Sequence, residues 1–172
     1  SRALNELLRL LNATKEEMVS ISQLSNQLVF GLDDKILSTR LIEGQYPDYN
    51  RIIPTNLDKE IILDRTEFLN TVDRVAAISS IDKVNIIKLE IKSGEINLSS
   101  STPELGQSSE SIEIGYEGDN FEINFNARFL MDGLKNFDEE KIRLLLGGSL
   151  SPVLLKCIDD ENYFCMIMPI RS

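Results

Sequence analysis

The sequence predicts an α+β protein in which paired helices pack on a predominantly antiparallel sheet, with the same unit repeated along the chain. Two observations support this. Segments with the apolar spacing of amphipathic helices alternate with runs of short β-type segments separated by polar turns. A stretch near the start also recurs near the end at a fixed offset of 126 residues, the spacing from Arg2 to Arg128. Repetition of this kind indicates a modular architecture.

The first part of the chain has the elements of half a unit. Leucines at positions 4, 7, 8 and 11 have the spacing of one helix face, which predicts a helix over residues 2–11. Three β-type segments follow, near residues 17–21, 27–32 and 35–42. Because one helix and a three-stranded meander cannot bury both of their faces alone, we expect the chain to begin inside a domain.

A proline-rich joint separates the two copies of the repeat. Residues 43–54 read Glu-Gly-Gln-Tyr-Pro-Asp-Tyr-Asn-Arg-Ile-Ile-Pro. Two prolines and a glycine forbid one continuous helix or central strand here. The aromatic and aliphatic residues are too frequent for a flexible linker, so we expect the joint to pack against something and to form part of a binding surface.

The part after the joint predicts one complete unit. Its order is strand, helix, four strands, helix and three strands, with helix caps at Asp64 and Asn126. The polar run 99–109 predicts an exposed loop. The expected strands lie near residues 57–63, 85–92, 95–100, 110–116, 121–125, 142–146, 153–158 and 163–169.

The composition excludes several classes of function. The 172 residues contain no histidine, which removes the commonest general base and metal ligand and excludes Ser/His/Asp or Cys/His catalysis within this chain. We expect no cofactor. No apolar run approaches the roughly 18 residues of a membrane span, so a cytoplasmic location is expected. Cys157 and Cys165, in strands expected to be neighbours, are interpreted as reduced thiols.

Paired carboxylates leave an enzyme as one alternative. Acidic residues are dense at 33–34, 138–140 and 159–160. Adjacent aspartates are more often turn formers than catalysts, and no histidine accompanies them. We therefore expect a protein that is not an enzyme.

A basic helix face recurs in both copies of the repeat, although the net charge of the chain is −10. Carboxylates at positions 6, 73 and 132 lie between the basic residues, and no aromatic residues accompany them to stack bases. Such a face predicts weak, salt-dependent attraction to duplex DNA without reading of its sequence. The basic positions are Arg2, Arg9, Arg74, Arg128 and Lys135.

Two motifs resemble a known family. Residues 41–54, which contain the joint, and the terminal run Met-Pro-Ile-Arg at 168–171 are similar to the bacterial DNA polymerase III beta subunit, the replicative sliding clamp. The resemblance covers the whole chain as a C-terminal fragment and implies the sliding-clamp (DNA clamp) fold. Residues 1–56 then correspond to the second half of the middle domain plus the joint, and residues 57–172 to the C-terminal domain. We expect this fragment not to close a ring by itself.

The resemblance implies a processivity factor of DNA replication. The family forms a head-to-tail ring dimer around duplex DNA and tethers the DNA polymerase III catalytic subunit, the clamp loader and other partners through a short peptide motif of glutamine followed by leucine and phenylalanine. The five basic residues become candidates for the DNA channel, and Ile78 and Ser79 for the dimer contact. The implied peptide pocket consists of Pro47, Arg51, Ile52, Leu150, Pro152, Met166, Ile167, Met168, Pro169, Ile170 and Arg171.

The chain differs from the family at its last residue, Ser172, where the family commonly has leucine. An acidic peptide-binding adaptor unrelated to DNA remains the alternative function. It shares the pocket with the clamp interpretation but predicts no enclosure of DNA. The residues themselves also allow Ile167 and Ile170 to be ordinary core residues.

Overall fold

A computed structural model of the chain describes residues 2–15, 17–79 and 85–171. Contacts divide the chain into two compact units, Ser1–Asp48 and Tyr49–Ser172, called here the first and second units. Residues 49–54 of the joint therefore group with the second unit. The assignment of residues 1–56 and 57–172 to two domains stays a prediction.

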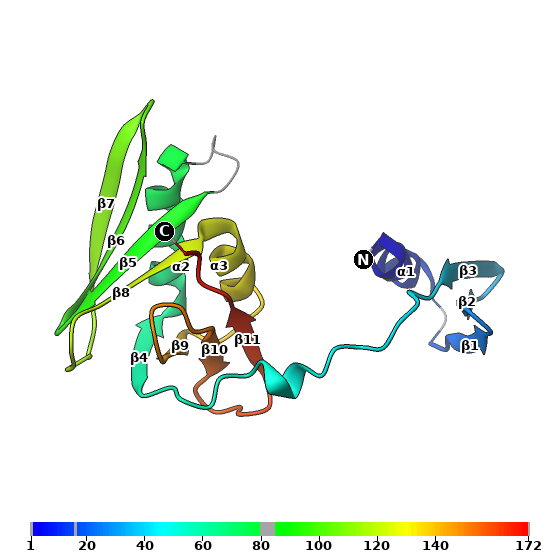
Figure 1. Cartoon of the computed structure of the whole chain (residues 1–172). Helices are drawn as coiled ribbons and strands as arrows, with labels where there is room; N and C mark the ends of the chain where they lie inside the picture. Colours follow the sequence, from blue (N-terminus) through cyan, green and yellow to red (C-terminus); the bar gives the residue numbers. More distant parts are fainter. Residues whose placement is uncertain (1, 16, 80–84, 172) are drawn as a thin grey trace. The chain divides into compact units, whose positions relative to one another are not determined.

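The first unit contains a helix and a three-stranded antiparallel sheet (Figure 1). Helix α1 has no buried residue, and burial in the unit concentrates at Phe30 and Leu32. The strand expected near residues 17–21 begins later, because a two-residue turn at Ser25 and Asn26 sets its pairing with the next strand. The elements are α1 Arg2–Ala13, β1 Ser20–Leu24, β2 Gln27–Leu32 and β3 Lys35–Arg40.

Within its described residues the second unit has the predicted order of strand, helix, four strands, helix and three strands. Short 3-10 turns precede the first strand and follow the first helix. The elements are η1 Tyr49–Arg51, β4 Lys59–Asp64, α2 Arg65–Ala76, η2 Ala77–Ser79, β5 Ile86–Lys92, β6 Glu95–Thr102, β7 Gly106–Glu113, β8 Phe121–Asn126, α3 Ala127–Leu134, β9 Lys141–Leu146, β10 Val153–Cys157 and β11 Phe164–Ile167.

The two halves of the second unit exchange their leading strands. Each half consists of a strand, a helix and three further strands. The leading strand β4 pairs with β9 of the other half, giving the order β11-β10-β9-β4, and β8 pairs with β5, giving β7-β6-β5-β8. All these pairs are antiparallel, and α2 and α3 contact each other beside the sheets (Figure 1). The predicted repeated α+β architecture is thereby confirmed.

Both helices of the second unit begin at the predicted caps. The side chain of Asp64 accepts a hydrogen bond from the backbone N–H of Glu67 at 2.8 Å, and Asn126 accepts from Arg128 at 3.0 Å. Each bond satisfies a backbone donor that the first helical turn leaves unpaired. Because each cap is also the last residue of a strand, strand and helix follow without a loop, and the direction of each helix is fixed by its sheet.

Burial distinguishes the two copies of the repeat. Leu130 and Leu134 of α3 are fully buried, whereas Leu4 and Leu8, their counterparts in α1, are 59% and 58% exposed. The apolar spacing is the same in both helices. The difference arises because α3 packs against α2, β8 and β11, and α1 has no second helix beside it within its own unit.

The prediction of an exposed loop over residues 99–109 is wrong. Strand β6 continues to Thr102 and β7 begins at Gly106, which leaves a three-residue connection. Alternate side chains of β6 point inward, and Ser100 is only 4% exposed. Its hydroxyl donates to the carbonyl of Ile86 at 2.8 Å, so the polar group is satisfied inside the protein. Serines that suggested a loop therefore have strand geometry.

Two leucines at corresponding positions, Leu130 in α3 and Leu4 in α1, test whether burial against neighbouring elements makes this position important for stability. Leu130→Ala should lower the free energy of unfolding by about 2–5 kcal/mol, because it opens a cavity in the core. Leu4→Ala, the matched control at 59% exposure, should change it by less than about 0.5 kcal/mol. Urea unfolding followed by circular dichroism measures both values. Equal losses in the two variants would contradict this account of the core.

Candidate functional site

An apolar hollow of about 580 Å³ lies between the start of α3 and the chain from β11 onward. Its volume falls in the range of roughly 300–1,000 Å³ found for ligand pockets. We call it the apolar hollow. It is lined by Asn126, Phe129, Cys165, Met166, Ile167, Met168, Pro169 and Ile170.

A close helix-to-strand contact forms one wall of the apolar hollow. Gly133 of α3 is buried against the sheet, and a Cβ atom at this position would lie 3.1 Å from Cδ1 of Ile167 and 3.2 Å from Sγ of Cys165. The absence of a side chain lets α3 approach β11 closely. Phe129 lies one turn earlier on α3 and is 62% exposed, so its ring is available at the surface of the hollow.

The segment after β11, residues 168–170, forms the opposite wall. Ile167 is 4% exposed and anchors the end of the strand in the core. Pro169 restricts the backbone, and the N–H of Ile170 then donates to the carbonyl of Asn124 in β8 at 2.8 Å. Met168 lies between these two anchors and is 59% exposed. A flexible thioether thus lines the hollow from a backbone that is held on both sides.

Five of the predicted pocket residues line the apolar hollow, and the others are not among its lining residues. Leu150 lines a second hollow, which also includes Ile170, and Pro152 is half-buried. Arg51 and Ile52 are exposed and line neither hollow. Pro47 is exposed and belongs to the first unit. Arg171 is also exposed and lines neither hollow. The residues lining the apolar hollow are Met166, Ile167, Met168, Pro169 and Ile170. The pocket assignment as a whole stays a prediction.

Sequence reasoning missed three residues of the apolar hollow, Asn126, Phe129 and Cys165. Asn126 had been assigned only as a helix cap, and its side chain does cap α3. The signal for Phe129 was present, because a large aromatic residue next to the inward Leu130 must point away from the core of the helix pair. An aromatic side chain on the outward part of a predicted helix is a reasonable indicator of a binding surface.

None of the described residues that line the apolar hollow carries a charged side chain. Cys165 is the one titratable residue among them, and burial raises the pKa of its thiol because desolvation disfavours the thiolate. The chain therefore offers apolar contacts and the Asn126 amide here, rather than a fixed charge. This lining suits an apolar peptide side chain and does not suit a phosphate or another strongly charged group.

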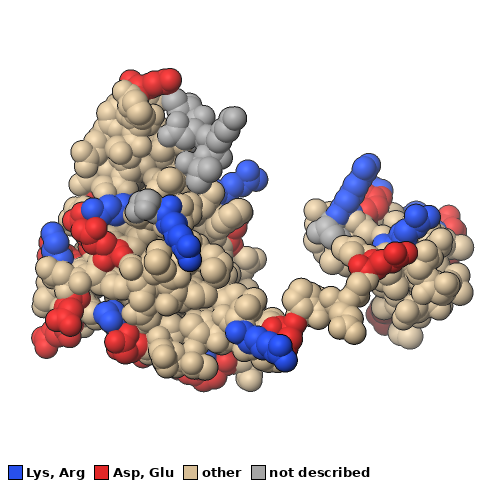
Figure 2. Space-filling view, in the orientation of Figure 1, with Lys and Arg blue, Asp and Glu red and all other residues tan. Residues whose placement is uncertain are grey.

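The basic candidates differ in their local partners. Arg9 donates to Glu6 through Nε at 3.0 Å, and Arg74 donates to Glu110 through Nε at 3.0 Å. Among the described residues, no ion pair involves Arg2, Arg128 or Lys135, and all three are exposed. On the face drawn in Figure 2, basic and acidic side chains lie interspersed on each unit. The DNA-channel role of these residues stays a prediction.

The two candidates for a dimer contact have different surroundings. Ile78 is half-buried, and Ser79 is 1% exposed. The hydroxyl of Ser79 lies 2.6 Å from that of Ser100 and also donates to the Asn85 side chain. Ser79 therefore fixes η2 to the sheet within the unit, and the contact predicted for this pair remains a prediction.

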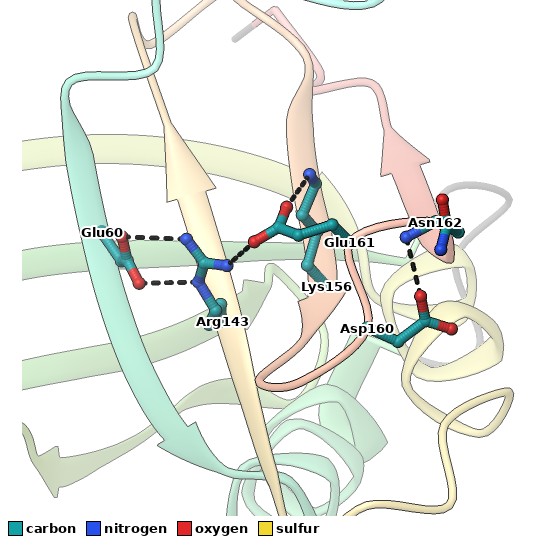
Figure 3. A network of polar contacts seen from close by, with 6 residues as sticks. All are labelled: Glu60, Arg143, Lys156, Asp160, Glu161 and Asn162. Atoms are coloured by element: carbon teal, nitrogen blue, oxygen red, sulfur yellow. Dashed lines mark hydrogen bonds and ion pairs between the residues drawn. The ribbon is translucent and has the colours of Figure 1, made fainter.

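An ion-pair network lies on the sheet that contains β4, β9 and β10, on the face that points away from the core (Figure 3). Arg143 of β9 donates to Glu60 of β4 at 2.7 Å and to Glu161 in the turn after β10 at 2.5 Å. Lys156 of β10 donates to the same Glu161 carboxylate at 2.7 Å. These hydrogen bonds raise the pKa of Arg143. The network joins the exchanged strand β4 to β9 and β10 of the other half.

Two of the three acidic runs contain turn-forming aspartates. Asp160 accepts from the backbone N–H of Asn162 at 2.8 Å, and Asp33 has a φ of 52° in the two-residue turn between β2 and β3. Cys157 and Cys165 are free thiols, and Leu155 rather than Cys157 stands opposite Cys165. Burial and a hydrogen bond to Glu139 raise the pKa of Cys157 to about 11.

Two general features are absent from the part of the chain that the structure describes. Its His, Cys, Asp and Glu side chains form no group of three or more that could hold a metal ion. Its helices include none that is long and apolar enough to cross a membrane.

The fold defines a modular α+β protein in which two similar halves exchange their leading strands. Residues 50–171 match the family described as DNA polymerase III beta subunit, C-terminal domain. The chain belongs to the DNA polymerase III beta subunit family. Its fold is the sliding-clamp fold, as the structural similarities below show.

Curated relatives and solved structures agree on this fold. The beta sliding clamps of Staphylococcus aureus and Staphylococcus epidermidis are 32% identical to this chain over 99% of its length, and the chain spans 45% of each. The sliding clamp of Bartonella birtlesii bound to griselimycin has a TM-score of 0.90 at 29% identity, and that of Bacillus subtilis 0.87 at 31%. Both structures match 99% of this chain, which covers 46% and 45% of theirs.

The ion-pair network predicts a loss of stability in acid. Hydrogen bonds from Lys156 and Arg143 lower the pKa of Glu161 from its ordinary value of 4.5. A carboxyl whose pKa is lower in the folded state stabilises fully above its unfolded pKa and loses that effect as the pH falls through the folded pKa. The urea midpoint of the unaltered protein should therefore be lower at about pH 3.5 than near pH 7, and Glu161→Gln should make this difference between the two midpoints smaller.

Asp159→Asn is the control, because it removes one negative charge from the same turn without removing an ion pair between described residues. The narrowing caused by Glu161→Gln should exceed that of the control. An unchanged or wider difference for Glu161→Gln would show that the network does not stabilise the fold.

Proposed function

We propose that this chain is the C-terminal portion of a processivity factor of DNA replication that encircles duplex DNA as a head-to-tail ring of two subunits. Membership of the DNA polymerase III beta subunit family and similarity to beta sliding clamps support the proposal. The chain spans less than half of those relatives, so ring closure would require the additional length that they have. Retention on DNA would then come from enclosure rather than from strong contacts.

The weak basic surface fits retention by enclosure. Arg128 and Lys135 are exposed at opposite ends of α3. Arg74 of α2 forms an ion pair with Glu110 of β7. A few separated cations among carboxylates attract phosphates without fixing a position on them. A ring with such a lining slides, because no contact has to be broken at a large cost in free energy.

The same protein would hold its partners through the apolar hollow. The observation that supports this best is a hollow with two exposed apolar side chains, Phe129 and Met168, on a rigid wall of helix and strand. An apolar hollow of this kind suits a leucine and phenylalanine pair, and the Asn126 amide suits the glutamine before them. The polymerase III catalytic subunit and the clamp loader are the proposed partners. No step of this function requires catalysis or a cofactor.

Peptide titration tests the tethering role on the chain itself. A fluorescent Gln/Leu/Phe-type peptide should bind, and Met168→Ala should weaken its binding at least roughly fivefold, because apolar contact area is lost. Ile170→Asp should weaken it more strongly, because it places a charge beside the bound apolar groups. Met18→Ala, a matched control that is 80% exposed in the first unit, should leave the titration unchanged. Identical curves for all four proteins would remove the assignment of the hollow.

DNA retention tests the enclosure. The polypeptide at the length of its relatives, loaded onto circular DNA, should remain bound there and should leave after the DNA is linearised. Equal retention on circular and linear DNA would contradict the topological mechanism. Binding of the peptide with no retention on either DNA would favour the acidic adaptor as the function.

A further inference from the structure

The second hollow lies at an open strand edge. Its volume is about 400 Å³, and it shares Ile170 with the apolar hollow, so the two are neighbours. We call it the edge hollow, because five of its lining residues belong to β8 or to the residue before it. The lining residues are Asn120, Phe121, Glu122, Ile123, Asn124, Ser149, Leu150 and Ile170.

The register of β8 determines which backbone groups face this hollow. Strand β8 is the last strand of its sheet, paired only with β5. The N–H of Ala127 donates to the carbonyl of Asn85, two pairs beyond Ile87 and Phe125 in the register with β5. Hydrogen-bonded pairs alternate along an antiparallel ladder, so Ile123 and Phe125 bond to β5.

Glu122 and Asn124, which alternate with these two residues along β8, therefore turn their backbone groups away from β5. The bond from Ile170 to the carbonyl of Asn124 agrees with this direction. The end of the chain thus makes the first contact of an added strand, at Asn124. Two residues along the same edge, the N–H and C=O of Glu122 face the edge hollow, and no other described residue forms a backbone bond with them outside the sheet.

We propose that a partner segment seated in the apolar hollow continues past Ile170 and adds as a short strand to the edge of β8 at Glu122. This inference rests on the proposed function of the apolar hollow. An edge with outward N–H and C=O groups is recognised by extended backbone of any sequence. Leu150, 57% exposed at the other side of the edge hollow, adds an apolar contact for one side chain of the added segment.

The partner chemistry follows from these contacts. The segment next to the docking motif is extended, has a free backbone N–H and C=O opposite Glu122, and lacks proline at that position. An apolar residue beside it contacts Leu150. Specificity would remain in the docking motif, because backbone bonds do not distinguish side chains, and the flanking segment would raise affinity.

The test compares three peptides on the full chain by titration. One contains only the Gln/Leu/Phe-type motif, and the others extend it by about five residues at the amino or the carboxyl end. One extension should raise affinity roughly three- to tenfold, the effect of one or two net hydrogen bonds. Glu122→Pro should abolish this gain and leave binding of the short peptide unchanged, because the lost N–H points away from β5 and proline is tolerated at such edge positions.

Glu122→Ala is the matched control, since it also removes the 3.3 Å ion pair with Lys88 but keeps the N–H, and it should retain the gain. If Glu122→Pro disturbs folding, a second set of peptides tests the same bond on the unaltered protein. Each is the extended peptide with one flanking backbone nitrogen methylated. Methylation at one position should abolish the rise in affinity that the extension gives. Binding of the short peptide without a gain from either extension would overturn the strand addition alone. Absence of binding by the short peptide would overturn the proposed pocket as well. If the chain self-associates and Glu122→Pro abolishes that self-association, the edge would instead bind a second copy of the chain.

Discussion

The exchange of leading strands between the two halves of the second unit is the constraint on which its structure depends. Strand β4 begins one half but completes the sheet of the other through β9, and β8 does the reverse through β5. Neither half can then keep its sheet without the other. The exchange also places α2 and α3 side by side over one continuous core that includes Phe68, Val72, Leu130 and Leu134. The Glu60–Arg143 pair reinforces it on the outer face.

The apolar hollow is a direct consequence of this arrangement. Because Asn126 ends β8 and caps α3, the helix starts where the exchanged strand stops. Strand β11 passes close to α3 at Gly133, and the following residues return to β8 through the bond between Ile170 and Asn124. The hollow lies where helix α3, the end of the exchanged strand β8 and the segment that follows β11 meet. Its walls are held by the core, which suits the proposed binding of several partners in one geometry.

The sequence predicted the order of elements in the second unit and both helix caps, because apolar spacing and cap residues are local signals. It missed the long β6–β7 hairpin, since a buried hydroxyl such as that of Ser100 is stabilised only by a distant partner, the carbonyl of Ile86. It found the apolar residues after β11 only through the resemblance. It did not place Phe129 in the hollow, because that requires knowing which strand passes beside α3. Long-range pairing was the information that local patterns lacked.

The central claim is that partner peptides occupy the hollow between α3 and the residues after β11. Nuclear magnetic resonance of the isotopically labelled chain, titrated with the Gln/Leu/Phe-type peptide, locates the contact without any substitution. The account predicts that the largest shift changes fall on Asn126, Phe129 and residues 165–170. Changes centred on the ion-pair face around Arg143, or spread evenly over the chain, would contradict it.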